Sequence, residues 1–216
     1  MINDERSKFN RFINLDSIED RIINYLISSN TIEANRIWKV LKYPDVDALL
    51  KPDLTKEEKS ALVDNGASDQ SERRVFRYPY FEDAFVVKGS ILRIYIDSVV
   101  PENHLVSKVN IGFDIISNNK INNLYNDEND EFENPEKYRP NSESIMFKSR
   151  NSVLLRNLLA ELNGREIEGV GVLQFNQDLS MFSQARLGFF NNQNYFGYKV
   201  LMACMQSGVD ICGSIK

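Results

Sequence analysis

The chain is poor in the residues that build most catalytic sites. Its 216 residues include two cysteines and a single histidine, and they contain no recognisable catalytic motif. His104 lies in the loop between two expected strands, and the sequence places no Asx residue or second histidine beside either cysteine. Nucleophilic catalysis through a histidine base is therefore not expected. Cys204 and Cys212 are interpreted as free thiols in a reducing compartment. No cofactor is predicted.

Long hydrophobic runs are also missing. The longest, Tyr195–Met205, contains Gly197 and Lys199 and is far too short to cross a bilayer. The N-terminal residues MINDERSKFNRF carry charge throughout and lack the apolar segment of a signal peptide. We therefore expect a soluble protein that is not exported by this route.

An excess of positive charge is absent too. Lys and Arg total 26 against 31 for Asp and Glu, which gives a formal net charge of −5. A phosphate-binding surface over much of the protein is therefore not expected, although a local basic patch stays open. The composition is otherwise ordinary for a globular protein, and a chain of this length can bury a sizeable core.

Two alternating stretches organise the rest of the chain. From Ile91 to Asp97 and from Val109 to Ile116, apolar and polar residues alternate as they do in half-buried strands. Pro101 cannot continue a central strand, so it is predicted to open a loop over residues 101–108 between two antiparallel strands. The polar positions, Asp97 and Asp114 among them, are expected on a solvated face.

Helix signals fill the first 66 residues. A capping residue with a glutamate three positions later occurs at Asp16, Asn30 and Thr55. Apolar residues follow at helical spacing, and Trp38 lies on the second stripe as a core or interface residue. Pro44 stops the second helix, and the third is expected to end near Gly66.

Further elements follow the helical segment. An edge strand is expected at residues 75–80, and a short strand or loop at 81–87. The apolar stripe from Val153 to Leu162 predicts a helix that covers one face of the sheet. Strands are then expected at 167–175, 186–190 and 195–206, with glycines that suggest bulges or close backbone approaches.

Together these patterns predict an α+β fold. Residues 1–66 form a helical N-terminal segment, and residues 67–216 form a mixed, mainly antiparallel sheet covered by a long helix. A long acidic loop is expected at 117–144. Its carboxylates lack the glycine-turned spacing of a calcium loop, so a solvated loop is favoured and no metal site is predicted.

A magnesium-dependent nuclease remains an alternative. Such an enzyme needs two or three carboxylates and a lysine at the edge of a sheet. Asp97, Asp114 and Lys108 are the residues available for this role, although solvated strand positions explain the two carboxylates better. A monomeric protein-binding module is a further class.

Several phrases of the sequence carry a resemblance to a known group. In the first half these are IWKVLKYPDVDALLKPDLTKEEKSALVDNG, RVFRYPYFED, ILRIYID and VNIGFDII. The chain resembles, in these phrases, neck and tail-completion proteins of tailed bacteriophages. RNLLAELNGREIEGVGVLQF and QARLGFFNNQNYFGYKV are similar to tail-terminator-like folds, in which one or two helices pack on a mixed sheet. The resemblance covers most of residues 30–206.

The resemblance implies a non-enzymatic virion structural protein of the head–tail junction: a tail terminator, a tail-completion protein or a neck ring of the head–tail connector. It implies a homo-oligomeric ring of six or twelve copies that is assembled in the host cytoplasm. The ring would contact neighbouring connector, neck, tail tube or sheath proteins, with no membrane involved. Genomic DNA would pass through its lumen without sequence-specific binding.

Two regions are candidates for the contacts of such a ring. The hypothetical interface or lumen residues are Trp38, Tyr43, Asp127, Glu128, Asp130 and Glu131. Helical arms and long loops suit the contacts that close a ring. Carboxylates in a lumen would repel phosphate and reduce sticking of DNA, whereas an acidic loop without a role is the alternative for these carboxylates.

Overall fold

A computed structural model of the chain describes residues 15–66, 72–78, 89–102, 106–125, 147–175, 187–191 and 194–207. In chain order the elements are α1 (Leu15–Ser28), α2 (Ile32–Lys42), η2 (Ala48–Leu50), α3 (Lys56–Ala61), β1 (Val75–Phe76), β2 (Ser90–Pro101), β3 (Val106–Asn118), η3 (Asn119–Ile121), β4 (Asn123–Tyr125), β5 (Phe147–Ser149), α4 (Arg150–Leu162), β6 (Glu166–Ile167), β7 (Gly171–Val172), β8 (Leu187–Asn191) and β9 (Tyr195–Ser207). None of the described helices has the length and apolar character that a membrane span requires.

A five-stranded sheet with the order β1-β2-β3-β9-β8 lies at the centre. β1 runs parallel to β2, and the other neighbours are antiparallel, which confirms the predicted α+β class and the mainly antiparallel sheet. The β2–β3 pair is confirmed, but its loop is shorter than expected. Pro101 still pairs with Ser107 at the strand end, so residues 102–105 make the connection.

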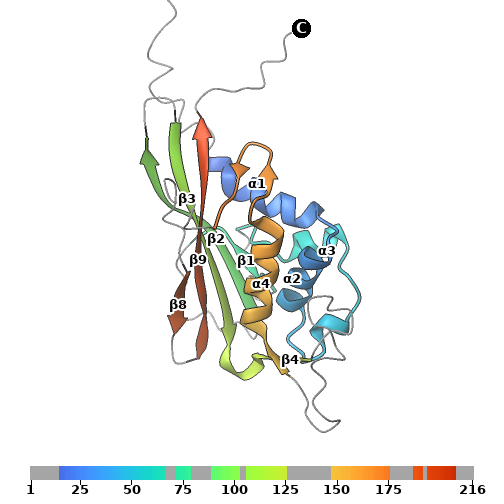
Figure 1. Cartoon of the computed structure of the whole chain (residues 1–216). Coiled ribbons are helices and arrows are strands. Elements are labelled where there is room, and N and C mark those ends of the chain that lie inside the picture. The colour runs from blue at the N-terminus through green and yellow to red at the C-terminus, as the bar shows by residue number, and fades with distance from the viewer. Residues whose placement is uncertain are drawn as a thin grey trace, which may run out of the picture.

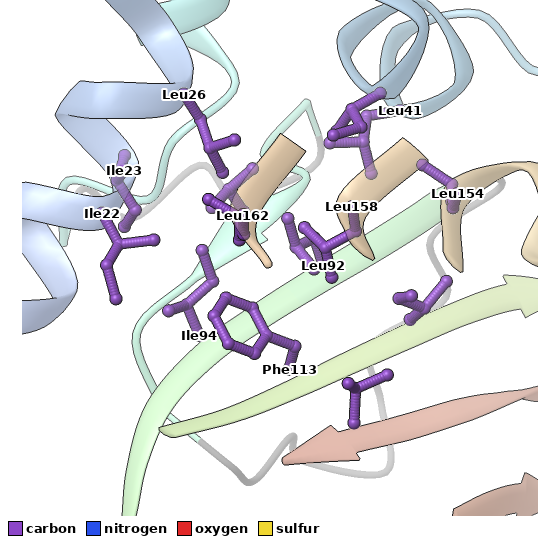
Figure 2. Packing of buried hydrophobic residues seen from close by; sticks show 14 of the residues in the cluster. Ile22, Ile23, Leu26, Leu41, Leu92, Ile94, Phe113, Leu154, Leu158 and Leu162 are labelled. Atoms are coloured by element: carbon purple, nitrogen blue, oxygen red, sulfur yellow. The ribbon is translucent and has the colours of Figure 1, made fainter. Parts of the chain in front are cut away.

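The helices lie on one face of this sheet (Figure 1). The predicted covering helix is confirmed as α4, whose Leu158 and Leu162 pack above Leu92 and Phe113 of the sheet (Figure 2). Ile22 and Leu26 of α1 belong to the same buried cluster. The N-terminal helices and the sheet therefore share one hydrophobic core.

Local hydrogen bonding corrects the predicted helix boundaries. Thr31, not Asn30, caps α2, because its hydroxyl accepts the Ala34 N–H. Asp16 lies in the first turn of α1 rather than at its cap. The capping box at Thr55 is confirmed. However, α3 ends at Ala61, because the following residues leave the helix to pair with β1.

Glycines explain the main differences among the strands. The strand expected at 167–175 is instead the tight hairpin β6–β7, whose Gly169 and Gly171 have φ of 73° and 85°. The close approach expected at Gly197 is confirmed, because an added Cβ would lie 1.7 Å from the Ile115 carbonyl oxygen. Strands β8 and β9 lie close to their predicted positions.

The remaining differences concern the edge strand and the acidic loop. The predicted strand at 75–80 has two residues, as β1, within the described part of the chain. Residues 117–125 form the end of β3, η3 and β4 rather than a loop, and β4 pairs with β5. Residues 81–87 and 126–146 lie outside the described ranges.

Candidate functional site

A row of charged side chains crosses the sheet on the face that points away from the helices. β2, β3 and β9 contribute Arg93, Asp114 and Lys199, which stand opposite one another in register. Asp114 Oδ2 lies 2.6 Å from Arg93 Nη2 and 3.8 Å from Lys199 Nζ. Asp114 and Arg93 are buried, whereas the Lys199 side chain is 48% exposed. One carboxylate therefore links the three long strands.

Tyr95 completes this charged row. Its hydroxyl donates to Asp114 Oδ1 at 3.2 Å, so both oxygens of the carboxylate have a partner. The ring lies over Gly112, where an added Cβ would come within 2.5 Å of it. Glycine is therefore needed at position 112 so that the tyrosine can reach the carboxylate.

Burial dominates the electrostatics of the row. It raises the pKa of Asp114, and the positive charges of Arg93 and Lys199 oppose that rise. Burial also lowers the pKa of Arg93 and, together with the nearby carboxylate, raises the pKa of Tyr95. A carboxylate held by an arginine in this way stabilises the register of the strands. It is poorly suited to act as a free base or a metal ligand.

The three residues available for a nuclease do not form one site. Lys108 and Asp114 are six positions apart on β3, which corresponds to about 20 Å. Asp97 is exposed, as expected, at the bulge of β2. The expectation that Asp114 is solvated was wrong, because Arg93 and Tyr95 pair with it in a buried position. Within the described residues, no three histidine, cysteine or acidic side chains are grouped to hold a metal.

A buried carboxylate also joins three helical elements. Glu161 of α4 accepts hydrogen bonds from Tyr25 Oη at 2.7 Å, Ser29 Oγ at 2.8 Å and Thr31 Oγ1 at 2.5 Å. Lys59 of α3 donates to the Ser29 carbonyl oxygen nearby. No sequence pattern indicated this cluster, apart from the position of Glu161 on the apolar stripe of α4.

Arg150 plays a similar part at the start of α4. Its fully buried guanidinium donates to the backbone carbonyl oxygens of Val40, Tyr43, Pro44, Asp45 and Ile121. Burial lowers its pKa to about 10. The arginine fixes the end of α2 against α4, where the orphan carbonyls of a helix need donors.

The predicted interface residues fall into two groups. Trp38 is 1% exposed and donates its ring N–H to the Leu26 carbonyl oxygen, which confirms its place in the core. Tyr43 is half-buried and packs against the core. An interface role for either residue stays a prediction. The other predicted interface residues, Asp127, Glu128, Asp130 and Glu131, lie outside the described ranges. His104 and Cys212 lie outside them as well.

One feature of the described residues was not singled out in the sequence, and the expectation of a free thiol at Cys204 is confirmed. Leu50, the last residue of η2, is 58% exposed, and Val46, just before η2, is 42% exposed. Cys204 is a buried free thiol whose pKa burial raises to about 11, so it is protonated at neutral pH and poorly reactive. Isolated exposed apolar residues are common on protein surfaces. Leu50 and Val46 differ from such residues only in that they lie close together in the sequence.

A family model described as YomW matches residues 34–204. The chain belongs to the YomW family. This family name is associated with phages of Bacillus. The match runs from α2 through most of β9 and so includes both the charged row and the covering helix. No curated protein and no solved structure matches the chain.

Proposed function

We propose that this member of the YomW family is a non-enzymatic structural protein of a phage virion. It assembles as a closed ring around the DNA channel at the head–tail junction, as a tail terminator, tail-completion protein or neck ring. The observation that carries the proposal is the match to a phage-associated family over residues 34–204. The helices on one face of a mainly antiparallel sheet support it, because the resemblance to tail-terminator-like folds implies this architecture.

The surface chemistry is compatible with this role. A net charge of −5 favours a lumen to which DNA does not stick. Leu50 and Val46 offer apolar contacts to neighbouring subunits or to connector and tail proteins.

Electron microscopy of the purified chain tests the ring. Negatively stained particles should give class averages with a central opening and six or twelve copies. The variant Leu50→Asp should reduce the fraction of rings if this side chain lies in the contact, whereas Lys51→Ala on the same turn serves as its matched control. Uniform single copies would contradict the proposal.

A cleavage assay separates the ring from the nuclease alternative. The account predicts that linear DNA stays intact with and without Mg²⁺. Cleavage that requires Mg²⁺ and disappears in Asp97→Ala would favour the enzyme, since this exposed carboxylate is available to a metal.

A further inference from the structure

A cleft lies between the hairpin β6–β7 and the end of β9. Gln174, which follows β7, and Ala203 of β9 exchange two backbone hydrogen bonds of 2.9 Å. Among the described residues this is the one backbone bridge between β9 and the hairpin, so the next facing pair, Val172 and Met205, is not joined. The strands separate there and leave a cleft of about 210 Å³, which Cys204 also lines.

The walls of this cleft fit an aliphatic side chain. None of the five lining residues carries a charge, and Val172, at 40% exposure, presents apolar surface to the outside. A cavity of about 150 Å³ is large enough to hold a benzene molecule. The cleft therefore has room for the four carbon atoms of a leucine side chain, and filling it would remove apolar surface from water.

The most exposed large apolar side chain among the described residues is Leu50, at 58% exposure. It ends η2, and contacts from inside the chain hold the segment around it. Arg150 donates to the Asp45 carbonyl oxygen at 2.8 Å, and Lys39 donates to the Leu49 carbonyl oxygen at 3.3 Å. A side chain on a segment that is already ordered loses little freedom when it binds.

The cleft and Leu50 lie at opposite ends of the sheet. Met205 of the cleft pairs with Lys108 near the start of β3, whereas η2 contacts β4, which follows the end of β3. The ten positions from Lys108 to Asn118 span about 33 Å of strand. In Figure 1 the orange hairpin lies near the top of the sheet and β4 near the bottom. Leu50 therefore cannot reach the cleft of its own chain.

We propose that Leu50 of one copy of this chain fills the cleft beside Val172 of the next copy. A second copy is the occupant because the chain carries both an exposed aliphatic side chain and an uncharged cleft that has room for it. Their separation within one chain means that only two copies can bring them together. Such a contact joins two different surfaces, so copies add head to tail and form a ring where the rotation closes.

This contact rests on the proposed function, since it supplies the repeating contact of the ring, but the two can fail separately. An open filament that depends on Leu50 would keep the contact and contradict the ring. A ring that tolerates every substitution in Leu50 and Val172 would keep the ring and contradict the contact.

Two variants that each lose one half of the contact test it. Leu50→Asp removes the apolar side chain, and Val172→Lys places a charge in the cleft. Each should raise the dissociation constant for self-association about tenfold or more, because an unpaired charge would be buried. An equimolar mixture should form a dimer and stop there, because the intact Leu50 of one variant fits the intact cleft of the other. Sedimentation equilibrium should then give twice the 24.9 kDa of one chain.

Ile32→Asp is the matched control. Ile32 is 50% exposed at the start of α2, so the same kind of change there should leave association at the wild-type level. An equal loss in Ile32→Asp and Leu50→Asp would overturn the proposal. A mixture of the folded Leu50 and Val172 variants that stays monomeric would overturn it too.

Hydrogen exchange of the unmodified chain covers the case in which a variant fails to fold. Amides 48–51 and 171–174 should gain protection together as the protein concentration rises through the dissociation constant, whereas amides 97–101 should not. Protection of the first two segments that is independent of concentration would overturn the contact. A wild-type chain that stays monomeric at every concentration would overturn both the contact and the ring.

Discussion

Both faces of the central sheet bury side chains, but different forces specify the two faces. The face toward the helices consists of apolar side chains such as Ile94, Ile111 and Phe113. The opposite face buries Arg93 and Asp114 at the same level of the same strands. Alternation in a sequence thus shows which residues share a face, but it does not show whether the second face meets water.

The second face is held by specific pairs rather than by general apolar contact. Besides the charged row, Asn110 Nδ2 donates to Ser98 Oγ at 2.9 Å. Because a shift of one residue would separate all of these partners, this face fixes the register that the apolar face alone leaves less sharply defined.

Removing the carboxylate of the charged row should have the largest effect on stability. Asp114→Ala should lower the free energy of unfolding by about 3–5 kcal/mol, because Arg93 would remain buried without its counter-charge. The control Asp97→Ala, on the exposed bulge, should change it by at most about 0.5 kcal/mol. Urea titrations of both variants measure the difference. Equally small effects would mean that Asp114 is solvated after all.

The apolar face should respond through packing instead. Leu158→Ala creates a cavity between α4 and the sheet and should cost about 2–5 kcal/mol. Unlike the loss from Asp114→Ala, this loss should vary little with pH. Ala160→Lys, at an exposed position of the same helix, is the control in the same urea titration. A loss below about 1 kcal/mol for Leu158→Ala would show that α4 does not cover the sheet as described.

The helix cluster around Glu161 gives a smaller effect with a defined pH dependence. Tyr25→Phe removes one hydrogen bond to this carboxylate and should cost about 1–2 kcal/mol at pH 7. Burial and Glu161 raise the pKa of Tyr25 from 10.0 to about 12 in the folded state. The folded chain therefore keeps this proton longer, and the wild type loses this stability as the pH rises from 10 through 12.

Unfolding measurements from pH 9 to 12 check this sign. The gap between the wild type and Tyr25→Phe should narrow over that range. A constant gap would indicate that the tyrosine has the same pKa in the folded and unfolded states.

The hydrogen bond from the Ile96 N–H of β2 to the Glu19 carboxylate of α1 should have the smallest effect on stability. Glu19→Ala leaves the Ile96 N–H without its acceptor and should cost about 1 kcal/mol, whereas Glu19→Gln can still accept this hydrogen bond. Burial raises the pKa of Glu19 above 4.5 in the folded state. The folded state then binds this proton more tightly, so the wild type should lose stability relative to Glu19→Gln as the pH rises above 4.5.

Thermal or urea unfolding of these Glu19 variants between pH 4 and 7 provides the test. A relative gain for the wild type with rising pH would reverse the predicted sign and place the carboxylate in a solvated, favourably paired position.

Much of the fold followed from local patterns, whereas the buried polar groups did not. The alternation around Phe113, the capping box at Thr55 and the stripe of α4 each predicted an element that the structure contains. Each of these signals is made by residues that lie within a few positions of one another in the sequence. The partners of Arg150 and Glu161 are separated from them by 105 to 136 residues in most cases, so no local pattern could reveal them.

The candidate site was predicted less well for the same reason. Asp114 stood out as a carboxylate on a strand, but its pairing with Arg93 depends on the register of β2 and β3. The hairpin β6–β7 was missed because glycines at positive φ in a strand pattern can mark either a bulge or a turn.

The native mass of the purified chain, measured by light scattering over a range of concentrations, tests the proposed ring most directly. The account predicts one discrete oligomer of six or twelve copies of the 24.9 kDa chain, with a mass that does not change on dilution within the stable range. A single species of 24.9 kDa at every concentration would contradict it and would favour a monomeric protein-binding module.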